Sequence, residues 1–580
     1  MNYESTSLIY KIKFFIGIIL LFFLIIIARL IHLQIILQSN LYTKSKKNFL
    51  RTETILPLRG NIVDRNSKLL ATNRPTSNLF WQGTGRNTLT PEQIITLQQL
   101  EVILKRPLLS DKEIFTSLKL AERLHQKFKI GSDISFEQLS KIMEQLGTQK
   151  NISIVTHFKR CYPYKNMASH LLGYLSRMDM QVFGKMGLEK IFDDTLKGQN
   201  GQKLKTINSF GRNLCETEVK KALPGQNIST TLDIELQKIV ETIFPKEFAG
   251  TFIVMDPENG DLLALLSQPN FDPALFLDPL QQDEWQLLQE NQPFLNRAFN
   301  AVYPPGSIFK LVSISALLEH NLINTQSSWN CQGFTCFANR QYWCNRRTGH
   351  GLINAEQALI HSCNIPFFET GKKITIDLLA DYAYRYGLGK KTNIMFAEQE
   401  GLIPTTLWKK QVKKEKWWPG ETLSVSIGQS YLLVTPIQVA RMISSIFTGF
   451  LVTPRILMDE PIIKDPLAIE IETRKFLQQS MQKVVHQGTG KSARQIKDIK
   501  IYAKTSTAQT SGLDKHDLGL KYLEHGWFVC YFSYKDQKPL TVVILIEHSS
   551  TSRTATEVAK NFLSHYKKMI DNDTLQENSM

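Results

Sequence analysis

The sequence lacks low-complexity tracts and repeats of fixed period, although it runs to 580 residues. A solenoid or another repeat architecture is therefore not expected. The content of 42% hydrophobic and 21% charged residues is typical of a globular chain. Because one hydrophobic core rarely serves a chain of this length, we expect two or more domains.

Motifs that bind nucleic acid are also missing, although the chain is basic. Lysine and arginine number 69 against 53 aspartates and glutamates, which gives a formal net charge of +16. The sequence has no Cys/His finger, no RNP-like motif and no clustered basic helix, so nucleic acid is not an expected partner. The excess of positive charge suits an anionic surface such as that of a membrane.

Polar side chains are absent from Phe14–Ala28, and Leu30–Leu37 extends this apolar segment with only His32 and Gln34 as polar residues. Together with Arg29, which can snorkel to an interface, the segment is long enough to cross a bilayer. No small-x-small cleavage pattern follows it, so the sequence predicts an uncleaved signal anchor at 14–37 after a tail at 1–13.

The positive charges around this segment do not decide its orientation, because they flank it on both sides. Two lysines precede the segment and four basic residues follow it: Lys11 and Lys13 before, and Lys44, Lys46, Lys47 and Arg51 after.

A Ser-x-x-Lys motif, Ser307 to Lys310, follows the chain break Pro304-Pro305-Gly306. An apolar run suited to a buried helix comes next, so Ser307 is expected at a helix N-terminus. The spacing puts Lys310 one turn on, on the same face, where its amine can reach the Ser307 hydroxyl. A lysine whose pKa is lowered by burial can take the proton of such a serine and make it a nucleophile.

The same spacing recurs at Ser480/Lys483 and at Ser564/Lys567, where we expect ordinary solvated helix faces.

Two further motifs lie downstream of Ser307. One is Ser362-Cys363-Asn364, and the other is Lys504-Thr505-Ser506-Thr507 within the predicted strand 501–508. Two more β-rich runs follow, at 525–532 and 540–547, and they suit an antiparallel sheet. A cationic strand edge facing a serine helix is suited to binding a carboxylate.

The order and type of these motifs resemble the Ser-x-x-Lys, Ser-x-Asn and Lys-Thr-Gly set of penicillin-recognising enzymes. Longer stretches resemble the elongation-type class B penicillin-binding proteins. Two positions depart from that family, because Ser506 and Ser430 stand where it usually has glycine. Ser506 is expected to tighten the cleft or alter antibiotic sensitivity, since a strand glycine lets a substrate approach closely. The stretches are Arg29–Gln34, Arg59–Asn66, Tyr162–Tyr164, His170–Tyr174, Gly187–Lys190 and Gly428–Pro436.

The resemblance implies an α+β fold with an N-terminal transmembrane helix. A mixed, non-catalytic pedestal (dimerisation-type) domain is expected at 38–230, with helices at Pro91–Leu104 and Phe136–Leu146 and a turn-rich segment at Gly184–Gly201. A penicillin-recognising serine transpeptidase domain is expected at 231–570, with a central antiparallel sheet flanked by helices. It opens with a hairpin around Pro257–Gly260, and its last helix, Ala555–Ile570, precedes a frayed tail at 571–580.

The resemblance further implies a peptidoglycan D,D-transpeptidase of cell elongation, which works through a serine acyl-enzyme and is a target of β-lactams. Its implied partners are stem peptides, a lipid-linked precursor and a membrane glycosyltransferase, and its implied place is the bacterial inner membrane with the catalytic domain in the periplasm. The implied catalytic residues are Ser307 as nucleophile, Lys310 as base, Ser362 and Asn364, together with Lys504, Thr505 and Thr507 at the strand edge.

Three alternatives share these motifs. A D,D-carboxypeptidase or β-lactamase-type hydrolase would use water as acceptor, and the anchor and the long N-terminal region argue against it. A β-lactam sensor would normally carry more membrane spans. A non-catalytic scaffold for a membrane glycosyltransferase would still support wall synthesis after Ser307→Ala.

Four of the seven cysteines fall between 331 and 363, and their spacing with a nearby histidine suits tetrahedral zinc. Elongation-type relatives also carry metal-ligand side chains between the first two motifs. We expect one structural zinc on Cys331, Cys344 and His350, with Cys336 as the preferred fourth ligand and Cys363 as the alternative. A disulfide, Cys331–Cys344 or Cys331–Cys336, is the competing interpretation.

Overall fold

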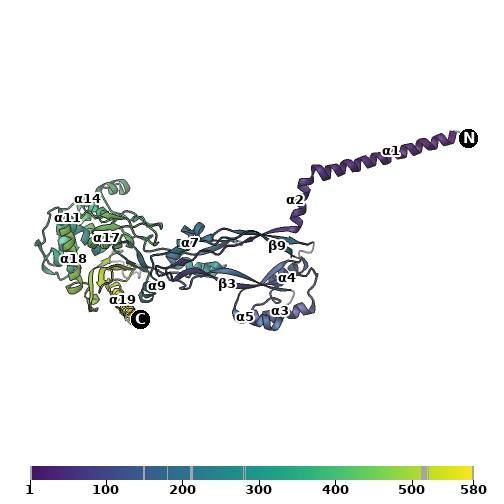
Figure 1. The fold of residues 1–580 in the computed structure, drawn as a ribbon. Helices are drawn as coiled ribbons and strands as arrows, with labels where there is room; N and C mark the ends of the chain where they lie inside the picture. The colour runs from purple at the N-terminus through teal and green to yellow at the C-terminus, as the bar shows by residue number, and fades with distance from the viewer. Residues whose placement is uncertain are drawn as a thin grey trace. The chain divides into compact units, whose positions relative to one another are not determined.

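The protein is described by a computed structural model. It describes residues 3–147, 151–178, 181–208, 213–278, 280, 282–510, 519 and 522–577 (Figure 1). By their internal contacts these residues form two compact units: the smaller comprises 1–59, 73–159 and 197–225, and the larger comprises 60–72, 160–196 and 226–580. The contacts thus assign three segments of the predicted pedestal, 60–72, 160–196 and 226–230, to the larger unit.

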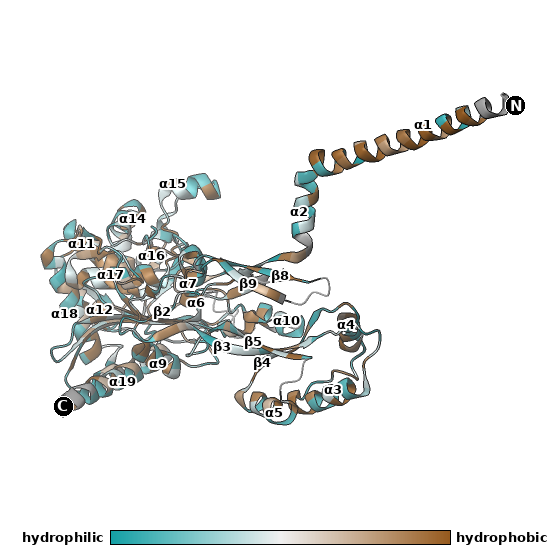
Figure 2. Cartoon of the chain, turned by 45° about the vertical axis from the view of Figure 1, so that its right-hand side comes forward, coloured by the Kyte–Doolittle hydropathy of each residue, from teal (hydrophilic) through white to brown (hydrophobic). Residues whose placement is uncertain are grey.

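The chain begins with α1 (Tyr3–Ile31), which continues through a π-helical turn, η1 (His32–Ile36), into α2 (Gln38–Phe49). Leu8–Ile36 is long and apolar enough to cross a membrane, and none of it is buried against the rest of the chain. Figure 2 shows α1 as almost uninterrupted hydrophobic colour. A helix that is apolar on all sides and exposed is typical of a membrane span.

The smaller unit contains a three-stranded antiparallel sheet of β1 (Leu50–Ile55), β8 (Gly201–Ile207) and β9 (Asn213–Lys220). A separate core lies between β3 (Leu69–Gln82), β4 (Lys127–Ile134) and three helices. These helices are α3 (Pro91–Leu104), α4 (Lys112–Arg123) and α5 (Phe136–Leu146), so both predicted pedestal helices are confirmed. Thr90 and Ser135 begin α3 and α5 with capping boxes.

The predicted turn-rich segment at Gly184–Gly201 instead contains two short helices, α7 (Gly187–Ile191) and α8 (Asp193–Lys197). Within it, Glu189 is fully buried and its Oε1 lies 2.7 Å from Arg160 Nε.

The larger unit is built on a five-stranded antiparallel sheet in the order β12-β11-β21-β20-β19. This arrangement confirms the predicted α+β class with a central antiparallel sheet. The predicted hairpin is β11 (Gly250–Met255) with β12 (Leu262–Gln268), and the three C-terminal strands are β19 (Ile499–Ala508), β20 (His525–Tyr534) and β21 (Leu540–Ile546).

Alternate residues of the sheet enter two different cores, as the period of a strand requires. Phe252 and Phe528 pack with α9 (Ile234–Ile243) and α19 (Arg553–Glu577) in one core. Ile253 and Val529 belong to the other core, which holds α11 (Lys310–Glu319), α17 (Pro436–Thr448) and α18 (Ile471–Gln487). Helices therefore cover both faces of the sheet.

The last helix, α19, runs seven residues past the end predicted for it at Ile570, so fraying from Asp571 is not observed through Glu577. Asp571 Oδ1 accepts hydrogen bonds from Tyr534 Oη at 2.6 Å and Lys535 Nζ at 2.5 Å. These bonds tie the extra turns to β20. Residues 578–580 of the predicted tail lie outside the described residues.

Candidate active site

Ser307 lies in a single 3₁₀ turn, η3 (Gly306–Ile308), that leads directly into α11. Gly306 has a positive φ of 53°, and its N–H donates to Gly428 O at 2.8 Å. A Cβ on Gly428 would lie 2.1 Å from Gly306 O, so the two glycines allow a backbone approach that no other residue permits. The turn holds Ser307 half-buried at the start of the helix, close to where the sequence predicts it.

Lys310 is fully buried and contacts the second motif. Its Nζ donates to Ser362 O and to Asn364 Oδ1, both at 2.7 Å, and lies 3.3 Å from Ser362 Oγ. Burial lowers the pKa of Lys310 to about 8. Ser362 Oγ in turn lies 2.8 Å from Ser307 Oγ, so Ser362 connects the buried amine to the Ser307 hydroxyl.

The second motif forms the turn between α12 (Ala355–Ile360) and α13 (Ile365–Gly371). Ser362 has a left-handed φ of 56°, a conformation that costs a non-glycine residue roughly 1–2 kcal/mol. The three bonds from Lys310 to Ser362 and Asn364 hold this turn in place. Strain of this kind is often found at functional sites, where the surrounding contacts maintain it.

Lys504 approaches the same hydroxyl from β19. It is fully buried, and its Nζ donates to Ser362 Oγ at 3.1 Å and to Thr505 O at 3.0 Å. Burial, and then the nearby charge of Lys310, holds the pKa of Lys504 well below its usual value. Among the described residues neither lysine pairs with a carboxylate, so no carboxylate offsets the effect of burial on their pKa values.

The remaining residues of the third motif differ in exposure. Thr505 is buried, and its Oγ1 lies 2.6 Å from Thr489 Oγ1. Thr507 is exposed at the strand edge, where its Oγ1 accepts a hydrogen bond from Ser552 N at 3.2 Å. Thr507 is thus exposed to solvent, whereas the buried Thr505 hydroxyl is held by its hydrogen bond to Thr489.

Ser506 is 2% exposed and contacts the turn that carries the first motif. Its Oγ accepts a hydrogen bond from Ser307 N at 2.7 Å and donates one to Pro305 O at 2.8 Å. The residue that departs from the family glycine is therefore bonded to the backbone of Ser307 itself.

Two contacts of the site were not foreseen from the sequence. Asn364 Nδ2 donates to Trp343 O at 3.0 Å, and Thr489 supports Thr505 as described above. The run Gly488-Thr489-Gly490 is the signal in the sequence that could have drawn attention to Thr489, and in the structure a Cβ on Gly488 would lie 2.2 Å from Ile360 O. The contact with Trp343 could not be predicted from the sequence, because it uses the backbone carbonyl, which every residue type has.

The two other Ser-x-x-Lys pairs are structural. Ser564 Oγ donates to Lys560 O at 2.9 Å, and Lys567 pairs with Asp498. The expectation of a solvated helix face is wrong for Ser480, which is fully buried and donates to Phe476 O at 2.8 Å.

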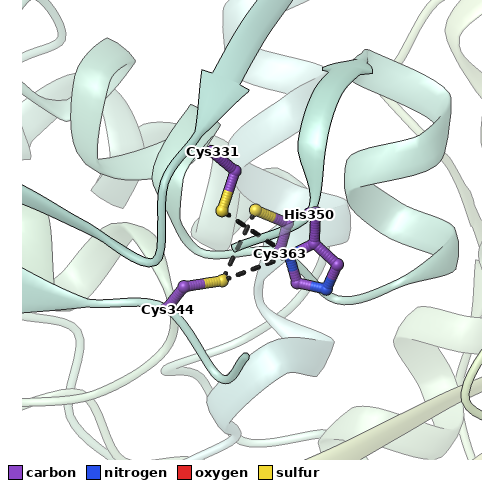
Figure 3. A group of neighbouring side chains, drawn as sticks. All are labelled: Cys331, Cys344, His350 and Cys363. Atoms are coloured by element: carbon purple, nitrogen blue, oxygen red, sulfur yellow. Dashed lines mark hydrogen bonds between the residues drawn. The ribbon is translucent and has the colours of Figure 1, made fainter. Parts of the chain in front are cut away.

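Four side chains of types that bind metals lie close together, and one of them, Cys363, belongs to the second motif. The sulfur and ring-nitrogen atoms of Cys331, Cys344, His350 and Cys363 all lie within 4.8 Å of one another (Figure 3). Cys344 Sγ lies 3.4 Å from His350 Nδ1 and 3.5 Å from Cys363 Sγ, and Cys331 Sγ lies 3.6 Å from His350 Nδ1. We call these four residues the Cys/His cluster.

The preference for Cys336 as fourth member of the cluster is wrong. Cys336 lies in β14 (Phe334–Phe337), which pairs with β15 (Arg340–Trp343), and its side chain is exposed. Cys363, the alternative, occupies that place from within the second motif. Each of the seven cysteines lies in the described part of the chain and is a free thiol.

The electrostatics of the Cys/His cluster favour a thiolate. The hydrogen bond from Cys363, backbone N–H groups and the charge of His350 lower the pKa of Cys344 to about 4. The pKa of Cys363 is raised, first by its bond to Cys344 and then by burial. Three thiols and one imidazole are the donor set that structural zinc prefers.

The chain is similar to known proteins in sequence and in fold. The chain matches the penicillin binding protein transpeptidase domain over residues 250–564, more than half of its length, and the penicillin-binding protein dimerisation domain over residues 54–230. It is 28% identical to the peptidoglycan D,D-transpeptidase MrdA of Acinetobacter baumannii, with 95% of this chain and 86% of that protein covered.

Two solved structures are similar over most of the chain. One is the complex between penicillin-binding protein 2 and MreC from Helicobacter pylori, with a TM-score of 0.74, 28% identity, and 90% of this chain and 99% of that chain covered. The other is a chain of a peptidoglycan synthase complex that coordinates polymerization and crosslinking. Its TM-score is 0.74 and its identity 27%, with 97% of this chain and 98% of that chain covered. The chain therefore belongs to the penicillin-binding protein transpeptidase family, within class B and of the penicillin-binding protein 2 type.

Proposed function

We propose that Ser307 is the nucleophile of this elongation-type peptidoglycan D,D-transpeptidase. Its Oγ attacks the carbonyl of the penultimate D-Ala of a donor stem peptide, the terminal D-Ala leaves, and an acceptor amine then resolves the acyl-enzyme. The observation that carries the proposal is the unbroken path Ser307 Oγ, Ser362 Oγ, Lys310 Nζ, with steps of 2.8 and 3.3 Å.

The proton of Ser307 travels along this path. When Lys310 is neutral, its lone pair can accept the Ser362 hydroxyl proton while Ser362 takes the proton of Ser307. The ammonium so formed is stabilised by Ser362 O and Asn364 Oδ1, each 2.7 Å from Nζ. The same proton returns through Ser362 to the leaving amine.

Lys504 acts on the carboxylate of the donor peptide. In the resting site its pKa lies well below the usual value, and an incoming carboxylate would raise that pKa because opposite charge favours the ammonium. Thr507 at the exposed strand edge, with Thr505 behind it, supplies hydroxyl groups for the same carboxylate. Asn364 keeps a second N–H beyond the one given to Trp343, and this donor is assigned to the amide of the stem peptide.

The backbone N–H groups of Ser307 and Thr507 form the proposed oxyanion hole. Donors aimed at the developing oxyanion are often the largest single contribution to acyl transfer, and the loss of one typically costs about 10²–10³ in rate.

Covalent labelling tests the nucleophile. Full-length protein incubated with a penicillin should gain the mass of one drug molecule, located on the Ser307 peptide by mapping. Ser307→Ala should gain none. The matched control is Ser564→Ala, which changes a serine of a structural Ser-x-x-Lys pair and should label like wild type. Labelling that persists in Ser307→Ala would remove Ser307 from this role.

We further propose that the Cys/His cluster binds one structural zinc. The support is the donor set of three thiols and one imidazole within 4.8 Å and the lowered pKa of Cys344. Zinc would hold Cys331, Cys344, His350 and Cys363 together, and since all four positions are then filled it has no place for substrate. Because Cys363 lies between Ser362 and Asn364, the cluster would brace the turn that binds Lys310.

The membrane setting is proposed from α1 and from the relatives. We infer that α1 anchors the enzyme by a single span in the bacterial inner membrane, with the larger unit in the periplasm, where stem peptides and lipid-linked precursor occur. A membrane glycosyltransferase is the expected partner, because a similar chain is part of a complex that coordinates polymerization and crosslinking. The hydrolase alternative gains no support, since the curated relative reported above is a transpeptidase.

A further inference from the structure

Ser506 makes two hydrogen bonds that a glycine at this position could not make. Its hydroxyl accepts from Ser307 N at 2.7 Å and donates to Pro305 O at 2.8 Å. The side chain is 2% exposed, and the bonds join β19 to the turn that carries the nucleophile. The Ser307 N–H is one of the two donors assigned above to the oxyanion hole, and in the resting enzyme its partner is the Ser506 hydroxyl.

We propose that the Ser506 hydroxyl is a latch that holds half of the oxyanion hole closed, so that acylation requires the latch to release Ser307 N–H. This inference rests on the proposed function of Ser307. It assigns to Ser506 a positioning role in the known reaction, since the hydroxyl acts through the backbone of Ser307.

The surroundings of the hydroxyl explain why the latch is closed at rest. A Cβ on Gly306 would lie 2.3 Å from Ser506 Oγ, so the oxygen occupies space that exists only because residue 306 is glycine. Pro305 supplies the carbonyl acceptor, and its ring fixes φ at this position of the turn. Both bonds of the hydroxyl are satisfied in this one position, whereas rotation would break both.

The latch makes a different prediction from simple crowding of the cleft. If the Cβ of Ser506 narrowed the cleft, only Ser506→Gly would remove the obstacle, so glycine would accelerate acylation and alanine would not. If the hydroxyl captures Ser307 N–H, alanine frees the donor as completely as glycine does. The pair Ser506→Ala and Ser506→Gly therefore separates the two explanations.

Stopped-flow acylation of the full-length protein by a chromogenic or fluorescent penicillin tests the latch. Ser506→Ala is expected to raise the acylation rate constant at saturating drug by roughly threefold to tenfold, the worth of one net hydrogen bond. The dissociation constant of the complex that precedes acylation should change little, because the freed donor acts on the developing oxyanion. Ser506→Gly should match Ser506→Ala within about twofold.

A thermal melt of the same variants supplies a second measurement. Ser506→Ala should melt at a lower temperature than wild type, because it leaves Pro305 O and Ser307 N without their partner. Faster acylation in a less stable protein supports the latch, since a merely structural serine would lose stability and rate together.

An acylation rate that is unchanged or lower in Ser506→Ala overturns the latch, and acceleration in Ser506→Gly alone assigns the effect to crowding. The proposed function fails separately: if the drug maps to a residue other than Ser307 in wild type, the nucleophile is wrong. Adduct on Ser307 with equal rates in wild type and Ser506→Ala rejects the latch alone.

Discussion

At the scale of single residues, Lys310 and Lys504 both contact the Ser362 hydroxyl, and burial lowers the pKa of both. Lys310, the proposed base, must be neutral to accept a proton, and its pKa is lowered to about 8 by burial. The acylation rate should therefore rise about tenfold per pH unit below this value and level off above it. Stopped-flow acylation from pH 6 to pH 10 measures the profile.

The Lys310→Ala variant should acylate at least about 10²-fold more slowly while it stays folded, as expected when one member of a proton-transfer pair is removed. Normal rates in this variant would exclude Lys310 as the base. If instead Lys504→Ala abolishes the rise with pH, the base is Lys504.

The lowered pKa of Lys310 also makes the free energy of unfolding depend on pH. The folded protein gives up the Lys310 proton near pH 8, whereas the unfolded chain keeps it up to about 10.5. Between these values the unfolded state binds more protons, so this residue makes the free energy of unfolding increase with pH.

Ser430, the other departure from the family glycine, has a left-handed φ of 69° and an exposed side chain. We expect Ser430→Gly to raise the free energy of unfolding by about 0.5–1 kcal/mol, because relief of about 1–2 kcal/mol of strain outweighs the extra chain entropy of glycine. Denaturant titration measures the change.

The control for Ser430 is Ser424→Gly, in the helix α16 (Pro419–Ser426), which should lower the free energy of unfolding by about 0.3–0.5 kcal/mol. Equal losses in both variants would show that Ser430 sits in its turn without strain.

Motif order predicted the second and third motifs beside the first. Residue spacing predicted direct contact between the Lys310 amine and the Ser307 hydroxyl, but among the described hydrogen bonds the amine reaches Ser362 Oγ, and Ser362 Oγ contacts Ser307 Oγ. The fourth member of the Cys/His cluster could not be chosen in this way. Cys336 lies nearer than Cys363 to Cys331 in sequence, but the β14–β15 hairpin leaves it exposed. The contact of Ser506 with Ser307 N joins residues 199 positions apart, which no local pattern encodes.

At the scale of elements, the Cys/His cluster connects the loop that precedes α12 to the turn before α13. Protein purified without chelator should contain about one zinc per chain by metal analysis. Cys344→Ser should lose the zinc and acylate more slowly at Ser307, because the turn carrying Ser362 and Asn364 is no longer braced.

The matched control for the cluster is Cys336→Ser, whose exposed thiol lies outside it and whose loss should change neither zinc content nor rate. A fully active, metal-free protein whose cysteines resist alkylation until reduced would decide for a disulfide instead.

Strands were easier to predict than the end of the last helix. The alternating or wholly apolar runs of β11, β12 and β19–β21 report burial in a sheet directly. The final turns of α19 depend instead on Asp571 meeting Tyr534 and Lys535, a tertiary contact that local propensity does not contain.

At the scale of the whole molecule, α1 adds nothing to the hydrophobic cores, since its span is unburied. A chain that starts at Gln38 should therefore remain in solution without detergent, whereas the full-length protein should require it. The acylation rate of the shortened chain should stay within about twofold of the wild-type rate. Fractionation by ultracentrifugation and stopped-flow acylation measure the two properties.

Aggregation of the shortened chain, or loss of its acylation, would show that the N-terminal helix contributes to folding as well as to anchoring.

The order of strands in the central sheet determines when the active site can form during synthesis of the chain. β11 cannot complete its pairing until β21 is made, since Gly250 pairs with Ile546, roughly 300 residues later, and such distant pairing forms late in folding. β19, which carries Lys504 and Ser506, pairs with β20, and β20 pairs with β21. Ser307 thus leaves the ribosome long before the strand that completes its surroundings. A chain whose C-terminal strands are not yet made therefore contains Ser307 but no active site. A protein truncated before β21 is likewise expected to have no partial activity.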